Sequence, residues 1–342
     1  MGDREAVVAY FAIPGDLASP TGGYAYARKI LPLFEEYAVA ITHLPLPGSF
    51  PYPTDEDIEA ARTALAATPE GAILLIDGLA LGALPPDLVK GLGRRVVALV
   101  HHPLGLETGL DEERRDALLR NEALVLSHCE RVVVTSPLTA EVLTEAFGVS
   151  PAVISIAEPG TDPAPPAEGS LEGEPLSILA VGAVSPRKGY ALLVEALSEL
   201  KHRPWHLTIA GASDRDPKAL EDLRAAIALQ ELDERVTLAG AVSEERLDEL
   251  YRSADIFVSA SLFEGYGVVL AEAMARGLPM VVSPGGAAAQ TVPDEAAIKV
   301  PPGDAYRLRA ALSRVIADPN ERSRLAHASL EAGRSLPRWN EA

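Results

Sequence analysis

Two glutamates are the residues of this sequence whose type and spacing first suggest chemistry. The stretch "SLFEGYGVVLAEAMARG", Ser261 to Gly277, carries Glu264 and Glu272 among residues that are otherwise almost all small or apolar. Within one helix, a separation of eight residues gives a rise of roughly 12 Å and an angular offset of about 80°. Because the segment is too apolar for a surface helix, we expect Glu272 to be buried and to need partners. Sugar or ribose hydroxyls would serve, and an ordinary buried ion pair is the alternative.

Two adjacent cations form the second candidate site. In "VGAVSPRKGYALL", Arg187 and Lys188 lie between a predicted strand and a predicted helix. Cations at a helix N-terminus oppose the helix dipole unless an anion is bound there. A diphosphate would resolve this conflict through charge-assisted hydrogen bonds, and two solvated surface cations are the alternative. The stretch lacks the P-loop pattern G-x-x-x-x-G-K-[ST], so we expect no P-loop.

Weaker signals follow two strands predicted in the first half of the chain. Gly22 and Gly23 immediately precede a helical pattern, so their amides would suit an anion, although a flexible connector is the alternative. His101 and His102 end another predicted strand, and we expect at least one of them to face a binding site. Asp214–Asp216 imitates a metal-binding D-x-D pattern, but it lies among turn residues and no metal is predicted there.

The elements that would position these residues alternate regularly along the chain. Short β-branched runs are predicted as strands at 7–13, 39–43, 72–76, 96–101, 131–135 and 152–156 in the first half. Further strands are predicted at 178–181, 207–210, 236–239, 256–259 and 280–283 in the second half. Amphipathic patterns between them predict helices that cover parallel sheets.

A segment rich in Pro, Gly and acidic residues, residues 158–175, separates the two halves and is predicted to be a linker. We therefore predict an α/β protein with a first domain at 1–160, a linker at 161–175, a second domain at 176–334 and a tail at 335–342. Open parallel sheets bind ligands at the carboxyl ends of their strands, so we expect the ligand in a cleft between two doubly wound domains.

Composition narrows the partners. The formal net charge of −19 over 342 residues argues against nucleic-acid binding, which needs many cations. The single cysteine, Cys129, fits a reducing compartment and packing, and no run approaches a transmembrane length. We expect a cytoplasmic protein. Weak association with a membrane at its inner face would rest on basic residues at 28–29, 90–95 and 114–120, and scattered solvated charges are the alternative.

Three motifs, in matching order and spacing, resemble one family. "FEGYGVVLAEA" resembles the E-x7-E signature of the family-4 retaining glycosyltransferases, which have the GT-B fold. "VGAVSPRKG" resembles their phosphate-binding "VGRLxPxKG", and "LAGAVSEERLDELYRSAD" resembles the stretch that leads into the signature. The resemblance covers the second domain almost throughout and implies two Rossmann-like domains that face each other across a cleft, with a C-terminal tail that returns toward the first domain.

The resemblance also implies roles for single residues. Glu272 would hold the ribose of a nucleotide sugar, Glu264 the hydroxyls of the donor sugar, and Lys188 the diphosphate. Amides of the turn would contact sugar and phosphate, and they belong to Gly265, Tyr266 and Gly267. Val242 would line the nucleobase, and Gly22 with Gly23 would form the loop over the phosphates. His101 would lie near the 6-hydroxyl of the sugar. Where the family often has an arginine, this chain has Ala183, and Arg187 would replace it.

The function so implied is transfer of a hexose, with retention and without a metal, from a UDP-sugar or GDP-mannose type donor to an undetermined acceptor. The donor is a nucleotide-diphosphate sugar, and no further cofactor is expected. The acceptor would be a saccharide, a lipid-linked molecule or a small molecule. Three alternatives remain at this point: a same-fold nucleotide-sugar epimerase or phosphorylase, a bilobal sugar-binding protein, and a non-catalytic nucleotide-sugar sensor.

Overall fold

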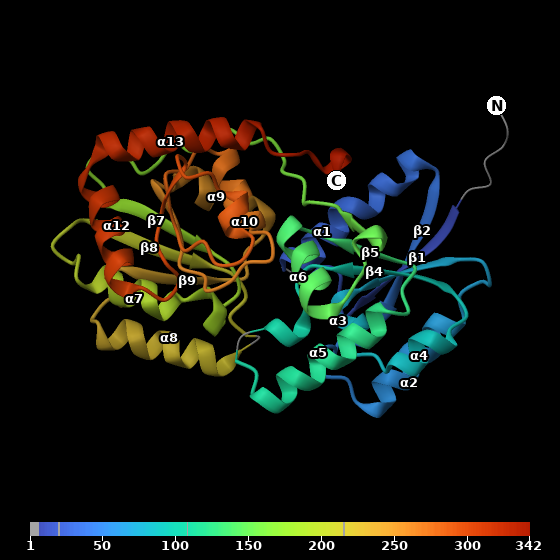
Figure 1. The fold of residues 1–342 in the computed structure, drawn as a ribbon. Coiled ribbons are helices and arrows are strands. Elements are labelled where there is room, and N and C mark those ends of the chain that lie inside the picture. The colour runs from blue at the N-terminus through green and yellow to red at the C-terminus, as the bar shows by residue number, and fades with distance from the viewer. Residues whose placement is uncertain (1–6, 20, 108, 215) are drawn as a thin grey trace. The chain divides into compact units, whose positions relative to one another are not determined.

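The structure is a computed structural model that describes residues 7–19, 21–107, 109–214 and 216–342. The chain divides into two compact units, residues 1–159 (with Ala342) and residues 160–341, here called unit 1 and unit 2 (Figure 1). The division falls between residues 159 and 160.

Unit 1 is built on a six-stranded parallel sheet in the order β2-β1-β3-β4-β5-β6. Its strands are β1 (Val7–Pro14), β2 (Val39–Leu46), β3 (Ile73–Asp77), β4 (Arg95–Val100), β5 (Arg131–Val134) and β6 (Ile154–Ile156). All six predicted strands are confirmed. The last is shorter than predicted because a 3₁₀ turn, η3 (Pro151–Val153), precedes it.

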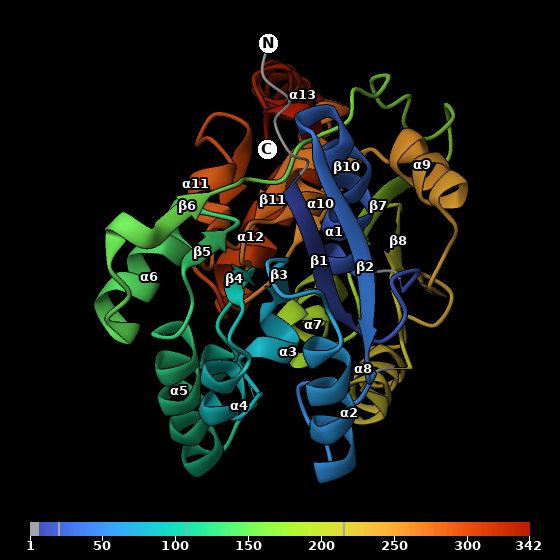
Figure 2. The same ribbon diagram turned by 90° about the vertical axis from the view of Figure 1, so that its right-hand side faces the viewer.

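The helices of unit 1 begin where the sequence offers capping side chains. They are α1 (Gly22–Ile30), α2 (Asp55–Ala66), α3 (Gly78–Leu81), α4 (Pro86–Gly91), α5 (Glu112–Leu126) and α6 (Pro137–Phe147), with the 3₁₀ turns η1 (Leu31–Tyr37) and η2 (Leu104–Leu106). Thr54 forms a capping box with Asp57 ahead of α2, and the Asp111 carboxylate accepts from an amide of α5. Figure 2 shows α2, α4 and α5 together below the strands. Apolar residues from these helices and from alternate strand positions form one core.

Unit 2 repeats this architecture with a second six-stranded parallel sheet, in the order β12-β11-β10-β7-β8-β9. Its strands are β7 (Leu176–Val181), β8 (Trp205–Ala210), β9 (Val236–Gly240), β10 (Ile256–Ser259), β11 (Met280–Val282) and β12 (Ala297–Lys299). The five predicted strands are confirmed. The sequence prediction missed β12, whose three residues are too few to show a periodic pattern.

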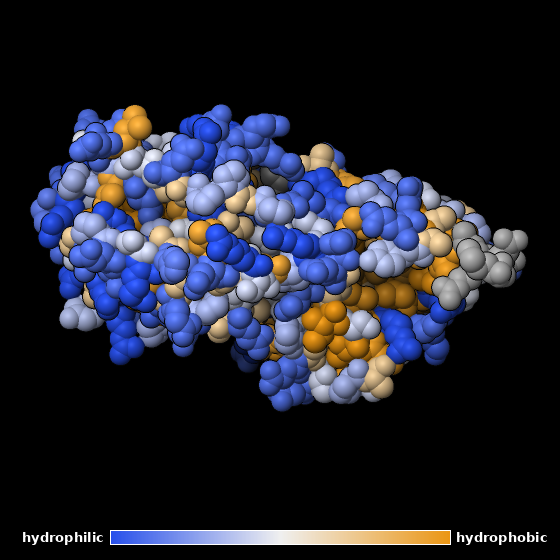
Figure 3. Space-filling model, turned by 90° about the horizontal axis from the view of Figure 1, so that it is seen from above, coloured by the Kyte–Doolittle hydropathy of each residue, from blue (hydrophilic) through white to orange (hydrophobic). Residues whose placement is uncertain are grey.

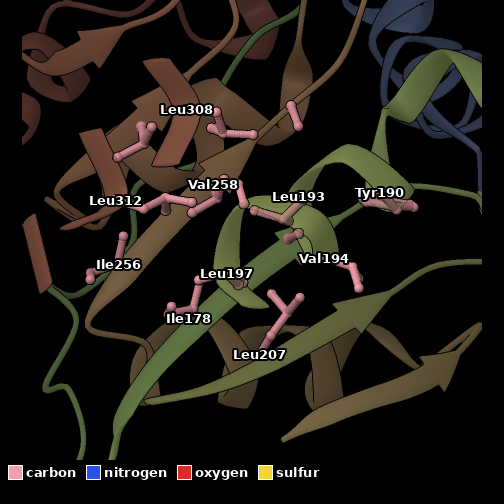
Figure 4. Packing of buried hydrophobic residues seen from close by; sticks show 14 of the residues in the cluster. Ile178, Tyr190, Leu193, Val194, Leu197, Leu207, Ile256, Val258, Leu308 and Leu312 are labelled. Carbon is pink, nitrogen blue, oxygen red and sulfur yellow. The ribbon is translucent and has the colours of Figure 1, made fainter. Parts of the chain in front are cut away.

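Helices cover both faces of the sheet in unit 2 (Figure 1). They are α7 (Tyr190–Ser198), α8 (Pro217–Leu229), α9 (Glu244–Ser253), α10 (Val268–Ala275), α11 (Ala288–Thr291), α12 (Ala305–Ala317) and α13 (Pro319–Arg334), and the 3₁₀ turns are η4 (Pro186–Lys188) and η5 (Trp339–Glu341). Figure 4 shows Leu193 and Leu197 of α7 among strand and α12 side chains in one buried core. A second core on the other face involves α9, α10 and α11.

The start and the end of unit 2 are joined by backbone contacts. The amide of Thr161 donates to the carbonyl of Pro337 over 2.8 Å, and the Arg338 guanidinium donates back to the carbonyl of Thr161 over 2.9 Å. A Cβ at Gly160 would collide with the backbone of Trp339. The linker and the tail therefore lie side by side, and only glycine fits at residue 160.

Candidate functional site

The candidate site of unit 2 centres on the buried carboxylate of Glu264, which is only 6% exposed. Lys188 donates to its Oε1 over 2.6 Å, and Arg187 lies 3.3 Å from its Oε2. The hydroxyl of Ser261 donates to Oε1 over 2.6 Å. These residues come from the segments that follow β7 and β10, so they meet at the carboxyl end of the sheet, where open α/β sheets bind ligands.

The sequence prediction that the two cations lie at a helix N-terminus is wrong. Arg187 and Lys188 do not begin the helix; they lie in η4, and Gly189 with a φ of 63° separates them from α7. Their anion is supplied by the chain itself, as Glu264. The conflict with the helix dipole is therefore resolved in the folded protein, and the interpretation as two solvated surface cations is wrong because Lys188 is only 9% exposed.

Backbone contacts fix the geometry around these charges. The Arg187 guanidinium also donates to the carbonyl of Phe263 over 2.7 Å, and the amide of Leu262 donates to the carbonyl of Arg187 over 2.8 Å. Glu264 bridges to Gly286, whose positive φ of 67° and close approach to the Glu264 carbonyl exclude a side chain there. The two loops are therefore tied to each other by backbone as well as by charge.

The charges also decide the ionisation of Glu264. Burial by itself raises the pKa of this carboxyl, but Lys188, Arg187 and the hydrogen bonds together outweigh burial and hold its pKa below the ordinary value. Glu264 thus stays ionised and keeps the Lys188 ammonium in place near the glycine-rich turn.

Glu272 occupies a different position from the one that helical spacing predicts. Only Glu272 lies on α10; Glu264 precedes the helix in a bridged loop, so the expected rise of roughly 12 Å does not apply. The expected burial of Glu272 is also wrong, since it is half-buried. Its carboxylate accepts from the hydroxyl of Tyr251 over 2.8 Å.

Tyr251 itself is enclosed. Burial, followed by the neighbouring Glu272 carboxylate, raises its pKa well above the ordinary value. The guanidinium of Arg276 lies over its ring at 4.6 Å. Glu272 is therefore held on one side by a neutral phenol, and the residue is half-buried.

The other residues predicted for the donor surround this region. Gly265, Tyr266 and Gly267 form the turn between Glu264 and α10, with Tyr266 buried and Gly267 at a φ of 92°. Val242 lies half-buried in the loop between β9 and α9 and packs against the core of that face. Ala183 follows Gly182, whose carbonyl accepts from the hydroxyl of Tyr190 over 2.8 Å.

One residue of the D-x-D pattern, Asp216, has a structural role. Asp216 caps α8 and accepts from the amide of Ala219 over 2.9 Å, while Arg215 lies outside the described residues. Among the residues that the structure describes, no group of three or more His, Cys, Asp or Glu side chains has metal-site geometry.

In unit 1 the structure brings Gly23 and His101 together at the carboxyl end of the sheet. A Cβ at Gly23 would lie 3.5 Å from the ring of His101, and Tyr26 meets that ring edge-on with centroids 5.2 Å apart. Gly22 is exposed at the start of α1, which Thr21 caps. His101 Nε2 is buried and, within the described residues, makes no hydrogen bond.

Asp77 is the functional candidate of unit 1 that the sequence prediction missed. It ends β3, is 4% exposed, and its Oδ2 lies 3.8 Å from Nε2 of His101. Burial raises the pKa of Asp77, opposed by His101 and by the amide of Leu79, and burial lowers the pKa of His101. A carboxylate directly after the apolar run "ILLI" was the available signal.

Most of the basic residues considered for a membrane surface have partners within the chain. Arg28 donates to the carbonyls of Leu17 and Ser19, and Arg95 forms a two-pronged pair with Glu130. Figure 3 shows hydrophilic residues over most of the visible face, with hydrophobic ones gathered on part of unit 1. In the described parts of the chain, each helix is too short or too polar to cross a bilayer.

Comparison with known proteins places this geometry in a family. The sequence pattern of the family described as glycosyl transferases group 1 matches residues 165–331. The chain is 30% identical over 295 residues to the MMP alpha-(1->4)-mannosyltransferase of Mycolicibacterium hassiacum, covering 81% of this chain and 70% of that protein. The chain belongs to the group 1 glycosyltransferases.

Two further similar proteins extend the comparison. Mannosylfructose-phosphate synthase of Agrobacterium fabrum is 31% identical over 183 residues, 48% of this chain, and the match spans only 40% of that protein. Sucrose-phosphate synthase from Thermosynechococcus elongatus superposes with a TM-score of 0.82 at 23% identity, over 97% of this chain and 95% of that one. This similarity, together with the two six-stranded parallel sheets, shows that the fold is GT-B.

Proposed function

We propose that this group 1 glycosyltransferase is a retaining, metal-independent enzyme of the family-4 type. It transfers a hexose from a nucleotide-diphosphate sugar, of the UDP-sugar or GDP-mannose type, to an acceptor hydroxyl. Glu264 and Glu272 form the E-x7-E signature of this proposal. The observation that carries it is the ion-paired cluster in which buried Glu264 holds Lys188 and Arg187 at the carboxyl end of the sheet.

The chemistry of the cluster suits a departing diphosphate. In retention, the acceptor attacks the face from which the diphosphate leaves, and negative charge develops on the leaving oxygen. Lys188 and Arg187 are fixed by Glu264 before the reaction, so they stabilise that charge without reorganising. Glu272, half-buried and held by Tyr251, is proposed to bind the ribose, and Val242 the base.

The ligands bound by fold neighbours support a sugar nucleotide as donor. The Anabaena protein HepE, with a TM-score of 0.74 and 16% identity over 96% of this chain, was crystallised with UDP-glucose. We propose the same class of ligand for unit 2 here. In unit 1, His101 is proposed to act on the transferred sugar and Gly22 with Gly23 on the phosphates, and the acceptor would be a saccharide, a lipid-linked molecule or a small molecule.

A thermal-shift screen against UDP, GDP, ADP and their hexose conjugates, with EDTA present, tests this function. A ligand at 100 times its Kd adds about 2.7 kcal/mol to the free energy of unfolding. Incubation of the stabilising sugar nucleotide with a panel of acceptors, followed by NMR of the product, then reports the anomeric configuration. Binding without turnover would indicate a sensor instead, and an inverted product would contradict retention.

A further inference from the structure

Glu122 is a buried carboxylate of unit 1 that has no part in the proposed chemistry. It lies on the apolar side of α5 and is 4% exposed. Its Oε1 accepts from the amide of Leu104 over 2.8 Å, and its Oε2 accepts from the amide of Gly105 over 2.9 Å. One side chain thus satisfies two backbone donors of η2, the turn that follows the strand-end histidines.

Among the described residues, the two amides of η2 are the hydrogen-bond partners of Glu122. A Cβ at Gly82 would lie 2.8 Å from Oε1, so the backbone of that residue closes one side. The adjoining void has a volume of about 10 Å³, no more than a single water requires. An ionised carboxylate without a cation is costly to bury, and burial raises the pKa of Glu122 to about 7, against the opposing effect of the two amides.

Charged groups on the neighbouring elements do not compensate Glu122. The causes of its raised pKa include no charged residue. The titratable residues carried by the elements around it are Asp77 before α3, Asp87 and Lys90 on α4, His101 and His102 before η2, Glu107 at its end, Glu141 and Glu145 on α6, Asp111 ahead of α5, and Glu112, Glu113, Arg114, Arg115, Asp116 and Arg120 on α5 itself. The ionisation of Glu122 therefore depends on burial and on the two amides.

The turn that Glu122 holds is the continuation of the histidine segment. His101, His102 and buried Pro103 lead directly into η2. The turn also packs against a second residue of α5, since a Cβ at Gly105 would lie 2.6 Å from Cγ of Leu119. The position of His101 at the end of β4 is thus fixed from one direction by the sheet and from the other by α5.

We propose that Glu122 is a positioning residue for the segment His101–Pro103 and that it holds this segment less firmly when its carboxylate takes up a proton. That Glu122 holds the turn follows from its two hydrogen bonds to η2. The effect on turnover rests on the proposed function, in which His101 acts on the transferred sugar. A carboxylate accepts stronger hydrogen bonds than a neutral carboxyl. The two amides lower the pKa of Glu122 against the effect of burial, so ionisation favours the closed turn over a turn that opens while Glu122 stays buried. Relative to that local opening, the turn is held more tightly above neutral pH and less tightly below it, whereas ionisation lowers the stability of the fold as a whole.

Hydrogen exchange of the peptide that contains Leu104–Glu107 tests the hold without any substrate. In the wild-type protein, protection of these amides, corrected for the intrinsic rate, should rise about five- to tenfold between pH 5.5 and pH 8. Glu122→Gln should remove this rise, because its single side-chain oxygen accepts from one of the two amides and does not titrate. Glu122→Asp should keep a rise with lower protection, since its carboxylate is one methylene short. Glu113→Gln, on the exposed face of the same helix, is the matched control and should behave as wild type.

The activity readout separates positioning from mere stability. With UDP-glucose as the probe, the kcat for UDP release by the wild-type protein should decrease as the pH falls, with a midpoint near pH 7. In Glu122→Gln this decrease of kcat should be absent, and the KM for UDP-glucose should stay the same. Equal, pH-independent protection of the peptide in wild type and Glu122→Gln would overturn the proposal. If the exchange result is as expected but UDP-glucose is not turned over, the hold stands and the choice of donor in the proposed function fails.

Discussion

The two units bury carboxylates at the carboxyl ends of similar sheets, but they treat the charge in opposite ways. In unit 2, Glu264 meets two cations and its pKa is held below the ordinary value. In unit 1, burial raises the pKa of both Asp77 and Glu122. Asp77 lies near His101, whose own pKa is lowered by burial, and Glu122 accepts hydrogen bonds from two backbone amides. The buried charges of unit 2 are therefore compensated by ion pairs, whereas the ionisation of the buried carboxyls of unit 1 depends on pH.

The largest expected effect concerns the compensated charge of unit 2. Lys188→Met leaves the buried Glu264 carboxylate with Arg187 as its remaining described cation, so it should lower the free energy of unfolding by up to about 3–5 kcal/mol. The double variant Lys188→Met/Glu264→Leu should regain most of this loss, because the buried carboxylate is then gone and the part-exposed Arg187 still donates to the carbonyl of Phe263. Urea denaturation of both variants at pH 7.5 measures the effect. A single variant as stable as wild type would show that Glu264 is not buried as described.

The next effect concerns the uncompensated charge of unit 1. The pKa of Glu122 is about 7 in the folded protein and 4.5 ordinarily, so the folded form binds more protons between these values. Its contribution to stability is fully present below pH 4.5 and is lost as pH rises through about 7. Glu122→Gln should therefore gain up to about 3 kcal/mol relative to wild type over this range, since one pKa unit is about 1.36 kcal/mol.

Urea denaturation at pH 4.5 and pH 8 measures this difference, with Glu113→Gln as a control that should shift nothing. If wild type and Glu122→Gln lost stability in parallel with rising pH, the contrast between the two units would fail.

A smaller effect is expected at Glu272, whose loss should affect binding more than folding. The side chain is half-buried and its neighbour Tyr251 retains another acceptor, the carbonyl of Val269 at 3.3 Å. Glu272→Ala should weaken nucleotide binding by about 1–3 kcal/mol through a lost hydrogen bond to ribose. Calorimetry with the nucleotide found in the screen measures this. Unchanged affinity would show that Glu272 does not bind the ribose.

No effect is expected from metal removal. The cations Lys188 and Arg187 already supply positive charge where a diphosphate would bind, so excess EDTA should leave the rate of transfer unchanged. An initial-rate assay with and without EDTA suffices as the measurement. Loss of activity that Mg²⁺ restores would contradict the metal-free mechanism.

The sequence predicted the elements better than it predicted the contacts between them. Alternating β-branched and amphipathic runs identify eleven of the twelve strands, and the residues at strand ends come out at the correct edge of each sheet. Contacts between residues far apart in the sequence could not be predicted. No local sequence pattern indicates that Glu264 pairs with Lys188, seventy-six positions earlier in the chain. Helical spacing also failed for Glu264, because the glycine-rich turn delays α10 until Val268.

Glu122 shows a signal that sequence reading overlooked. It is spaced three and four positions from Val125 and Leu126 and three from Leu119, so it falls on the apolar face of α5. A carboxylate on such a face requires a partner, as with Glu272, yet the partners here are amides of η2. Backbone donors of a turn leave no mark in the sequence.

The central claim is that the cation pair held by Glu264 serves a nucleoside diphosphate. Titration calorimetry of UDP, GDP and ADP in EDTA, on wild type and on the Lys188→Met/Glu264→Leu double variant, tests it most directly because the double variant is expected to stay folded. We predict that at least one nucleotide binds wild type and binds the double variant at least tenfold more weakly. Equal affinity for both proteins, or binding of none of the three nucleotides to wild type, would contradict the account.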